Sequence, residues 1–535
     1  MKELALINGN IYTQDPLVPN ASAILFRNGR TAAIGSENDI RAASQKAEFV
    51  DLEGQLALPG LTDAHFHFYD WSFSRRNLSL ASASSLHEIQ KQLSQAASSN
   101  LSGKWILGQG WNETLWSDPR LPGLEDLDKS VPNHPCILWR SDLHLAVVNS
   151  KALELSGITA SIPNPPGGVI DRDTSGKPTG ILRELAINLV SNKIPLPGEE
   201  ETLQAMRDAF PALHKLGLTA LHDFRIMGGP EGARAFKAYQ RLRDNEELSL
   251  RLWMHIPYER LEHAIALGLR TGFGDDFLRV GHIKLFSDGS QGARTAWMLE
   301  PYQDVGHAGM ALTPMNEIAE AVYQADCAGL AVAIHAIGDR ANRELIGVFE
   351  EVLRQPEARG LRPSAPHRIE HVQNIRPEDL SRLSRLGVIA SVQPIHATDD
   401  MPMLEQSVGE QSRYCYVFKD MLEAGITLAL GSDCPVADPN PFYGIHAAVT
   451  RQNRDQQPAG GWYPAQRLSV AEAVWGYTMG PAITAGRVKD QGSLTPGKLG
   501  DLVVVDRDIF NIEPKEIAGA QVRMTVLGGQ VVYRV

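Results

Sequence analysis

Short apolar runs alternate with amphipathic segments over most of this chain. The runs have the length of buried strands, and the segments between them, for example 316–329 and 342–353, have apolar residues at the spacing of a helix. Together with a strand that ends at His65, the pattern predicts eight strands, the other seven lying at 218–224, 248–256, 279–286, 330–335, 367–371, 388–393 and 426–432.

This alternation predicts an α/β fold, and eight strand–helix units indicate a (β/α)8 TIM barrel. An open, doubly wound parallel sheet is the alternative. Polar residues recur at the C-terminal ends of several predicted strands, where barrel enzymes assemble their active sites, and they favour the barrel.

Both ends of the chain are expected to contribute strands to one small β-domain. Strand patterns occur at 4–7 and 23–26, and again at 500–506, 522–527 and 531–533. Because chain termini often lie close together, we expect residues 1–58 and 486–535 to form a composite, β-sandwich-like domain. The barrel would then occupy residues 59–485.

The connection between the first two barrel strands is far longer than an ordinary loop, so residues 69–210 are expected to fold as an insertion. It is rich in tryptophan, and residues 167–180 have the pattern of a hairpin. The tryptophans could pack a satellite core, or the insertion could form a lid. A loop leaving a catalytic strand end lies over the barrel mouth, which favours the lid, with Trp71, Trp111 and Trp116 as candidate substrate-stacking residues.

The composition is that of an ordinary globular protein, and it narrows the choice of partners. The 535 residues carry a formal net charge of −12, which argues against nucleic acid and anionic membranes. Four cysteines, none in a C-x-x-C pair, predict reduced thiols in a cytoplasmic protein. We expect neither a signal peptide nor a membrane-spanning segment. A small-molecule substrate is therefore expected, and a homodimer is left open.

The first barrel strand ends in His65-Phe66-His67. Side chains two positions apart on a strand share a face, so both imidazoles can bind one metal ion. The pair alone is equally consistent with structural histidines. Later strand ends add four further candidate ligands: Lys284, His335, His371 and Asp433.

The order H-x-H, Lys, His, His, Asp on strands one, four, five, six and eight resembles the amidohydrolase superfamily of metal-dependent hydrolases. The segments IKLFSDGSQGARTA, AIHAIGDRAN, RIEHVQ and LGSDCPV are similar to its family-three branch of YtcJ-like enzymes, which includes N-substituted formamide deformylases. The resemblance covers essentially the whole chain. It implies a binuclear centre of two divalent metal ions, with Zn²⁺ as the first choice.

The resemblance also implies how the ligands divide between the two ions. Lys284 is expected as N6-carboxylysine, because a carbamate offers two oxygens whereas a neutral amine is a poor bridge. One ion would be held by His65, His67, Lys284 and Asp433, and the other by Lys284, His335 and His371. An unmodified lysine in a one-metal site is the alternative.

The expected reaction is hydrolysis of a non-peptide C–N bond, in an amide or N-substituted formamide, by a metal-activated hydroxide. Asp433 is the expected proton carrier and His396 a candidate for stabilising the oxyanion, while His144 and His396 are candidates for substrate contacts. Deamination, or opening of a cyclic amide or lactone, is the first alternative, and a non-catalytic barrel protein is the second. Cys434 is disfavoured as a nucleophile because its neighbours do not form a G-x-S-x-G elbow.

Overall fold

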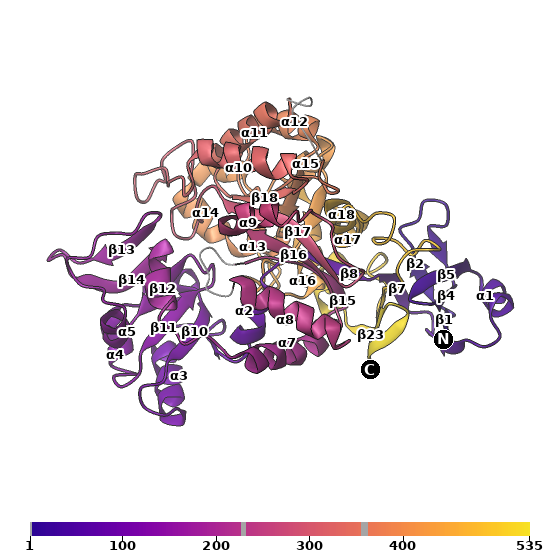
Figure 1. The fold of residues 1–535 in the computed structure, drawn as a ribbon, viewed down its shortest axis with the longest axis horizontal. Helices are drawn as coiled ribbons and strands as arrows, with labels where there is room; N and C mark the ends of the chain where they lie inside the picture. Colours follow the sequence, from indigo (N-terminus) through magenta and orange to yellow (C-terminus); the bar gives the residue numbers. More distant parts are fainter. Residues whose placement is uncertain (1–2, 226–231, 355–361) are drawn as a thin grey trace.

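A computed structural model describes residues 3–225, 232–354 and 362–535. Three parts follow one another across the molecule in Figure 1. The segment inserted after the first barrel strand lies on one side, the barrel lies in the middle, and the strands of both chain ends lie on the other side. The molecule therefore places the insertion and the terminal strands on opposite flanks of the barrel.

The barrel is the eight-stranded parallel sheet that the sequence predicts. Its strands are β8 (Leu61–Phe66), β15 (Leu218–Asp223), β16 (Arg251–Pro257), β17 (Leu278–Phe286), β18 (Val332–Ala336), β19 (Arg368–His371), β20 (Ile389–Val392) and β21 (Leu428–Leu430). They neighbour one another in chain order, and a parallel bridge between Phe66 and Cys434 brings the two edges together. This order confirms the barrel and excludes the doubly wound sheet.

Helices cover the outside of the barrel, as expected for strand–helix units. They include α7 (Glu199–His214), α8 (Gly232–Asp244), α9 (Leu261–Ala266), α10 (Met315–Cys327), α11 (Asp339–Leu353), α12 (Pro377–Leu386), α15 (Phe418–Glu423), α17 (Val470–Gly476) and α18 (Met479–Thr484). In α10 the residues Ile318, Val322 and Ala325 are buried, at spacings of four and three, so one stripe of the helix packs on the barrel.

Strands from both chain ends share one sheet. It runs β24-β23-β22-β7-β2-β3, and β7 pairs with β22 through Leu58 and Val503. A second sheet, β5-β4-β1-β6, shares a hydrophobic cluster with the first. The strands are β1 (Glu3–Ile7), β2 (Asn10–Tyr12), β3 (Asn20–Ala21), β4 (Ala23–Arg27), β5 (Arg30–Gly35), β6 (Glu48–Asp51), β7 (Leu56–Pro59), β22 (Leu502–Val505), β23 (Val522–Leu527) and β24 (Gln530–Arg534).

The insertion has a sheet of its own, in the order β13-β14-β12-β11-β10-β9. It consists of β9 (Leu78–Ser79), β10 (Ile106–Trp111), β11 (Cys136–Arg140), β12 (Leu145–Val148), β13 (Gly168–Arg172) and β14 (Pro178–Glu184), with α3 (Leu86–Ser99), α4 (Leu124–Asp128) and α5 (Ser150–Leu155) beside them. The antiparallel pair β13–β14 is the predicted hairpin. Two hydrophobic clusters, to which β11 and β12 contribute alternate residues, make the insertion a structure with its own core.

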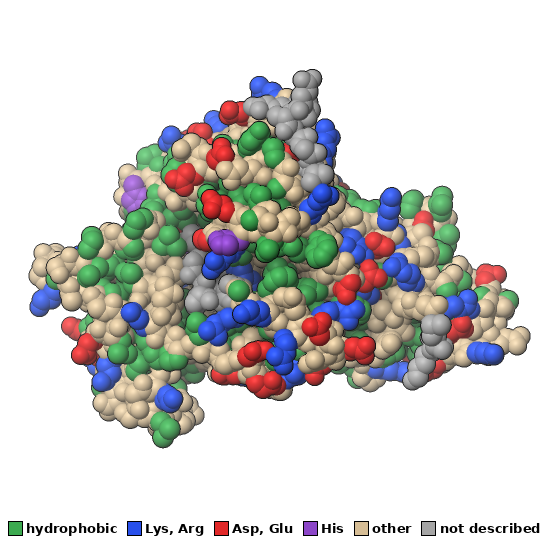
Figure 2. Space-filling view, in the orientation of Figure 1, with side chains coloured by type: hydrophobic (Ala, Val, Ile, Leu, Met, Phe, Trp, Pro, Cys, Tyr) green, Lys and Arg blue, Asp and Glu red, His purple; other side chains and the backbone are tan. Residues whose placement is uncertain are grey.

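On the face of the molecule that Figure 2 draws, charges of neither sign gather into a large patch. Acidic and basic side chains are interspersed over the barrel and the terminal strands on the face drawn in Figure 2. Within the described part of the chain, no helix is both long and apolar enough to cross a bilayer.

Gly60 alone separates β7 of the terminal sheet from β8 of the barrel. A Cβ at this position would lie 2.4 Å from Thr219 Oγ1 and 2.8 Å from Asp501 Cβ. The chain therefore passes from one domain to the other through a space that accepts only glycine.

We expect Gly60→Ala to destabilise the fold by about 1–3 kcal/mol, because Thr219 and Asp501 would have to move. The free energy of unfolding in urea is the measurement. Gly347→Ala is the matched control, since a Cβ there, within α11, meets nothing within 4 Å. A Gly60→Ala protein as stable as the control would contradict this account.

Candidate metal centre

Three predicted ligands meet where the first and last barrel strands come together. His65 is the fifth residue of β8, and His67 follows the strand. Asp433 lies just past β21 and places Oδ1 3.3 Å from His65 Nε2 and 3.0 Å from His67 Nε2. All three side chains are buried. The H-x-H pair therefore shares one face of the strand end, as predicted, and its partner is the carboxylate of strand eight.

The other three predicted ligands complete a ring around the same point. His335 lies in β18, His371 is the last residue of β19, and their ring centroids are 4.6 Å apart. Lys284 lies in β17, with Nζ between the rings of Phe224 and Phe286 at 4.9 and 4.6 Å from their centroids. Among the described residues no carboxylate forms an ion pair with this lysine. Six ligands predicted from five strands thus line one cavity.

Burial sets the charge of this cluster. Desolvation lowers the pKa values of His65, His335 and His371 well below their ordinary value, so the three rings are neutral. Burial also lowers the pKa of Lys284 to about 8. For Asp433, burial would raise the pKa, but the neighbouring rings of His65 and His67 outweigh it and hold the pKa well below its usual range.

Glu370, which sequence reasoning missed, orients the first ligand. Its Oε2 is 2.7 Å from His65 Nδ1, which leaves Nε2 of that ring facing Asp433. Arg368 Nη2 donates to Glu370 at 2.9 Å and to the Ala64 carbonyl at 2.7 Å. The same arginine donates to His222 Nδ1 at 2.9 Å, so this strand-two histidine supports the network from below. A carboxylate behind a ligating histidine is a common way to fix its tautomer.

Asp63 is a second support that sequence reasoning missed. Its carboxylate accepts hydrogen bonds from the backbone N–H of His65 at 3.0 Å and from the Ser432 hydroxyl at 2.6 Å. It also accepts from the Ser432 backbone N–H. Asp63 thus ties the strand that carries His65 to the loop that carries Asp433. Its place within the LTDAHFH run was the only available signal.

The insertion reaches the cluster through His144. The ring lies between β11 and β12, and its centroid is 5.6 Å from that of His335. Glu184 Oε2 accepts from His144 Nδ1 at 2.7 Å. Burial would lower the pKa of His144, but the charges of Glu184 and Asp142 raise it to about 9. A protonated imidazole of the insertion therefore faces the barrel ligands.

The structure separates the predicted tryptophans into two groups. Trp71 lies on α2 (Phe68–Ser74) and lines a cavity that reaches Asp433. Trp111 and Trp116 instead belong to a hydrophobic cluster of the insertion, where their Nε1 atoms donate to the carbonyls of Leu138 and Ala83. Neither lines a cavity at the site, so the expectation that they stack on substrate is corrected: they pack the satellite core.

Two other tryptophans of the insertion face the cluster. Trp105 and Trp139 line the cavity that contains Lys284 and His335. The insertion therefore forms both a separate core and a wall of the cavity, the two arrangements that its sequence left open.

His396, on α13 (Pro394–Asp399), is buried with Nε2 4.0 Å from Asp433 Oδ2. That nitrogen has no hydrogen-bond partner among the described residues.

The residues present fit a metal centre. One donor atom from each of His65, His371 and Asp433 lies within 4.8 Å of the other two. Buried His67 Nδ1 has no hydrogen-bond partner among the described residues. Neutral imidazoles and an ionised carboxylate are the ligands that Zn²⁺ and similar divalent ions prefer. The donor set therefore suits a divalent cation better than a further proton.

Comparison with known proteins agrees with this chemistry. Residues 48–533 match the family model Amidohydro_3, described as the amidohydrolase family. The chain is 28% identical to the putative amidohydrolase YtcJ of Bacillus subtilis, over 98% of both chains. It is also 28% identical to the N-substituted formamide deformylase of Arthrobacter pascens, over 100% of this chain and 98% of that protein. The resemblance read from the motifs is confirmed.

A solved structure extends the likeness to three dimensions. An uncharacterised metal-dependent hydrolase of Pyrococcus horikoshii superposes with a TM-score of 0.77 at 28% identity. The match covers 96% of this chain and 99% of that one. The insertion and the terminal strands therefore belong to the shared architecture together with the barrel.

We expect Glu370→Gln to weaken metal binding about 10–100-fold, because an amide cannot hold His65 and balance Arg368 as a carboxylate does. Competition with a chromophoric chelator measures the affinity. Exposed Glu317 provides the matched control as Glu317→Gln. Equal affinities for the two variants would show that Glu370 does not act on the metal ligands.

Proposed function

Because the chain belongs to the amidohydrolase family and is a metal-dependent hydrolase of carbon–nitrogen bonds, we propose that it hydrolyses a non-peptide amide or N-substituted formamide at a centre of two divalent ions. The convergence of six ligands from five barrel strands on one buried point carries this proposal. The formamide alternative draws on the similarity to the Arthrobacter deformylase.

The proposed ligand assignment follows the two halves of the ring. His65, His67 and Asp433 would hold one ion, and His335 and His371 the other. Lys284, between them, would bridge both as N6-carboxylysine. Support comes from its burial, with no ion-pair partner among the described residues, and from its pKa of about 8, because carbon dioxide reacts with the neutral amine. Zn²⁺ is the ion that we favour.

The bound ions would supply an acidified water and polarisation of the substrate carbonyl. The protein's own residues accept and donate the protons of the reaction. Asp433, ionised at neutral pH, is placed to accept a proton from the attacking water and deliver it to the leaving nitrogen. His396 Nε2 is buried and has no hydrogen-bond partner in the described part of the chain, and in the tautomer with its proton on Nε2 it is placed to donate to the developing oxyanion. His144 closes the opposite side of the cavity.

The compartment is proposed on a separate observation. All four cysteines are free, and three of them are buried. Free thiols are the rule in the reducing cytoplasm, so we propose a cytoplasmic enzyme.

Asp433→Asn should lower kcat by several orders of magnitude with a small change in KM, because the amide cannot carry the proton. Steady-state kinetics on a panel of N-formyl amines and N-acyl amines measures this effect. Removing metal with a chelator should abolish wild-type activity, and Zn²⁺ should restore it. Near-normal kcat in Asp433→Asn would remove this residue from the proton-transfer step.

Lys284 carboxylation should appear as one added carbon dioxide in the native intact mass, lost on acidification. Lys284→Met should lack the added mass and bind fewer metal ions per chain. Plasma emission spectrometry gives the metal content. Two ions bound per chain beside an unmodified lysine would contradict the bridge and leave the hydrolase assignment standing.

A further inference from the structure

Two large cavities meet at the metal ligands. The first has a volume of about 1020 Å³ and the second about 920 Å³. Both are lined by His144, His335, His371 and Asp433. A scissile bond held at these ligands therefore has one space open on each side of it, which we call the first and the second branch.

The first branch is lined by charged residues of both signs, such as Arg76, Lys104 and Glu201, and by a group of aromatic and aliphatic side chains. Trp105, Leu107 and Trp139 of the insertion line it, together with Phe73 and Phe286. Such walls favour an aromatic or aliphatic group through burial of its surface.

The second branch is acidic. Six carboxylates line it besides Asp433: Asp142, Asp399, Asp400, Glu405, Asp438 and Asp455. Three arginines and the protonated ring of His144 oppose them, and Arg140 is already bonded to Glu113 and Asp142. Asp399 and Asp400 form no ion pair with any described residue. Burial raises the pKa of Asp400, although the charges of His396 and Arg140 and a hydrogen bond from the Tyr416 hydroxyl lower it.

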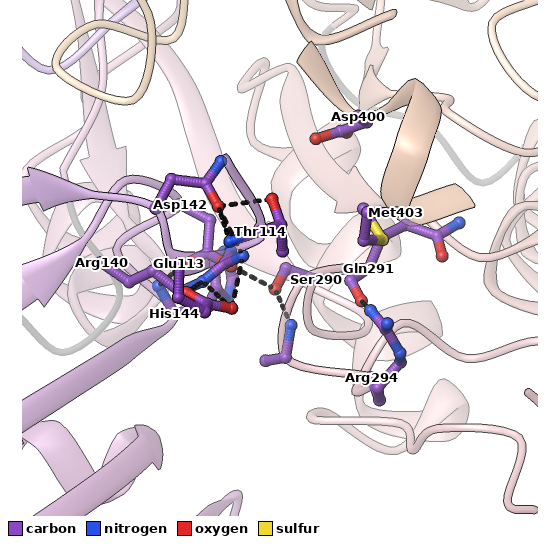
Figure 3. Close-up of polar contacts among 12 residues, drawn as sticks. Glu113, Thr114, Arg140, Asp142, His144, Ser290, Gln291, Arg294, Asp400 and Met403 are labelled. Atoms are coloured by element: carbon purple, nitrogen blue, oxygen red, sulfur yellow. Dashed lines mark hydrogen bonds and ion pairs between the residues drawn. The ribbon is translucent and has the colours of Figure 1, made fainter. Parts of the chain in front are cut away.

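Gln291 adds an observation that points to a ligand. It lies on the loop after β17, is 1% exposed, and lines the second branch. Neither Oε1 nor Nε2 of its side chain has a hydrogen-bond partner among the described residues. Figure 3 shows it beside Met403 of α14 (Met401–Ser407), away from the bonded cluster of Arg140 and Asp142. Buried amides are normally satisfied, so this one is available to a bound molecule.

We propose that the substrate is an amide substituted on both sides of the scissile bond, with an apolar group in the first branch and an ammonium-bearing group in the second. Gln291 Oε1 would accept a hydrogen bond from the ammonium, and Asp400 would face its charge. The inference rests on the proposed amide hydrolysis and narrows it, because a formamide has only hydrogen on the acyl side and would leave one branch empty.

A substrate series tests the assignment with the metal-loaded enzyme. Phenylacetyl cadaverine carries both groups, phenylacetyl hexylamine replaces the ammonium by methyl, and N-formylcadaverine lacks the apolar acyl group. The benzylamides of aminohexanoic and heptanoic acid repeat the comparison with the amide reversed. We expect kcat/KM to be about tenfold higher for the ammonium amide than for its methyl analogue in one orientation. N-formylcadaverine should be the poorest of the cadaverine amides.

Two variants of Gln291 test the contact itself. Gln291→Leu and Gln291→Met keep the volume and remove both hydrogen-bonding atoms, and each should reduce the ammonium-to-methyl ratio about tenfold. Gln324→Leu, on the exposed face of α10, is the matched control and should keep the wild-type ratio. Because two different substitutions are made at Gln291, the test can still be carried out if one of the two variants does not fold. A ratio unchanged in both would overturn the role of Gln291.

A binding measurement separates this inference from the proposed reaction. Calorimetry on the metal-loaded wild-type enzyme, with analogues in which a methylene replaces the amide N–H and prevents hydrolysis, should give a Kd about tenfold lower for the ammonium analogue than for its methyl counterpart. Hydrolysis of both amides at equal kcat/KM in both orientations would overturn the branch assignment and keep amide hydrolysis. Preferential binding without any hydrolysis by the wild type would count against amide hydrolysis and support the branch assignment.

Discussion

The site depends on the contact between the first and last barrel strands. Asp433 N–H donates to the His65 carbonyl at 2.8 Å, and His67 N–H donates to the Cys434 carbonyl at 2.9 Å. Gly431 permits this approach, since a Cβ there would lie 2.5 Å from the His65 nitrogen. Asp63, bonded to Ser432 across 369 positions of the chain, locks the same junction. The contacts that close the barrel are therefore the same contacts that bring the metal ligands together.

Much of the fold and the ligand set could be predicted because both follow from strand ends. Parallel strands gather their C-terminal residues at one mouth, so His335 and His371 fall beside Asp433 once the strands are identified. Asp63 and Glu370 could not be assigned roles in this way. Alternation gives the face of a side chain, but their partners, Ser432 and Arg368, become evident only when the strands are in place.

The tryptophans show a second limit of sequence reasoning. Trp111 and Trp139 lie in paired strands of one sheet, yet Trp111 packs within the insertion and Trp139 lines the cavity. The chain contains no local signal for which side of this sheet faces the barrel, because both sides bury apolar residues. That choice is made by docking the insertion onto the barrel, where Gly292 leaves room for Asp142 and Arg140.

Electrostatics explains why the walls of the cavity can vary more freely than the metal centre. Burial keeps His65, His335 and His371 neutral around one ionised carboxylate, and Arg368 balances Glu370 beneath them. The rings are also hydrogen-bonded to their surroundings, His335 to the Gly289 carbonyl and His371 to Gln393 Oε1, so a change in any of these side chains disturbs the cation site first. The residues that line the cavity walls do not hold the cation or its ligands in place. Trp105 and Trp139 can change in size without touching a ligand's hydrogen bonds, which leaves the insertion free to reshape the cavity around a fixed centre.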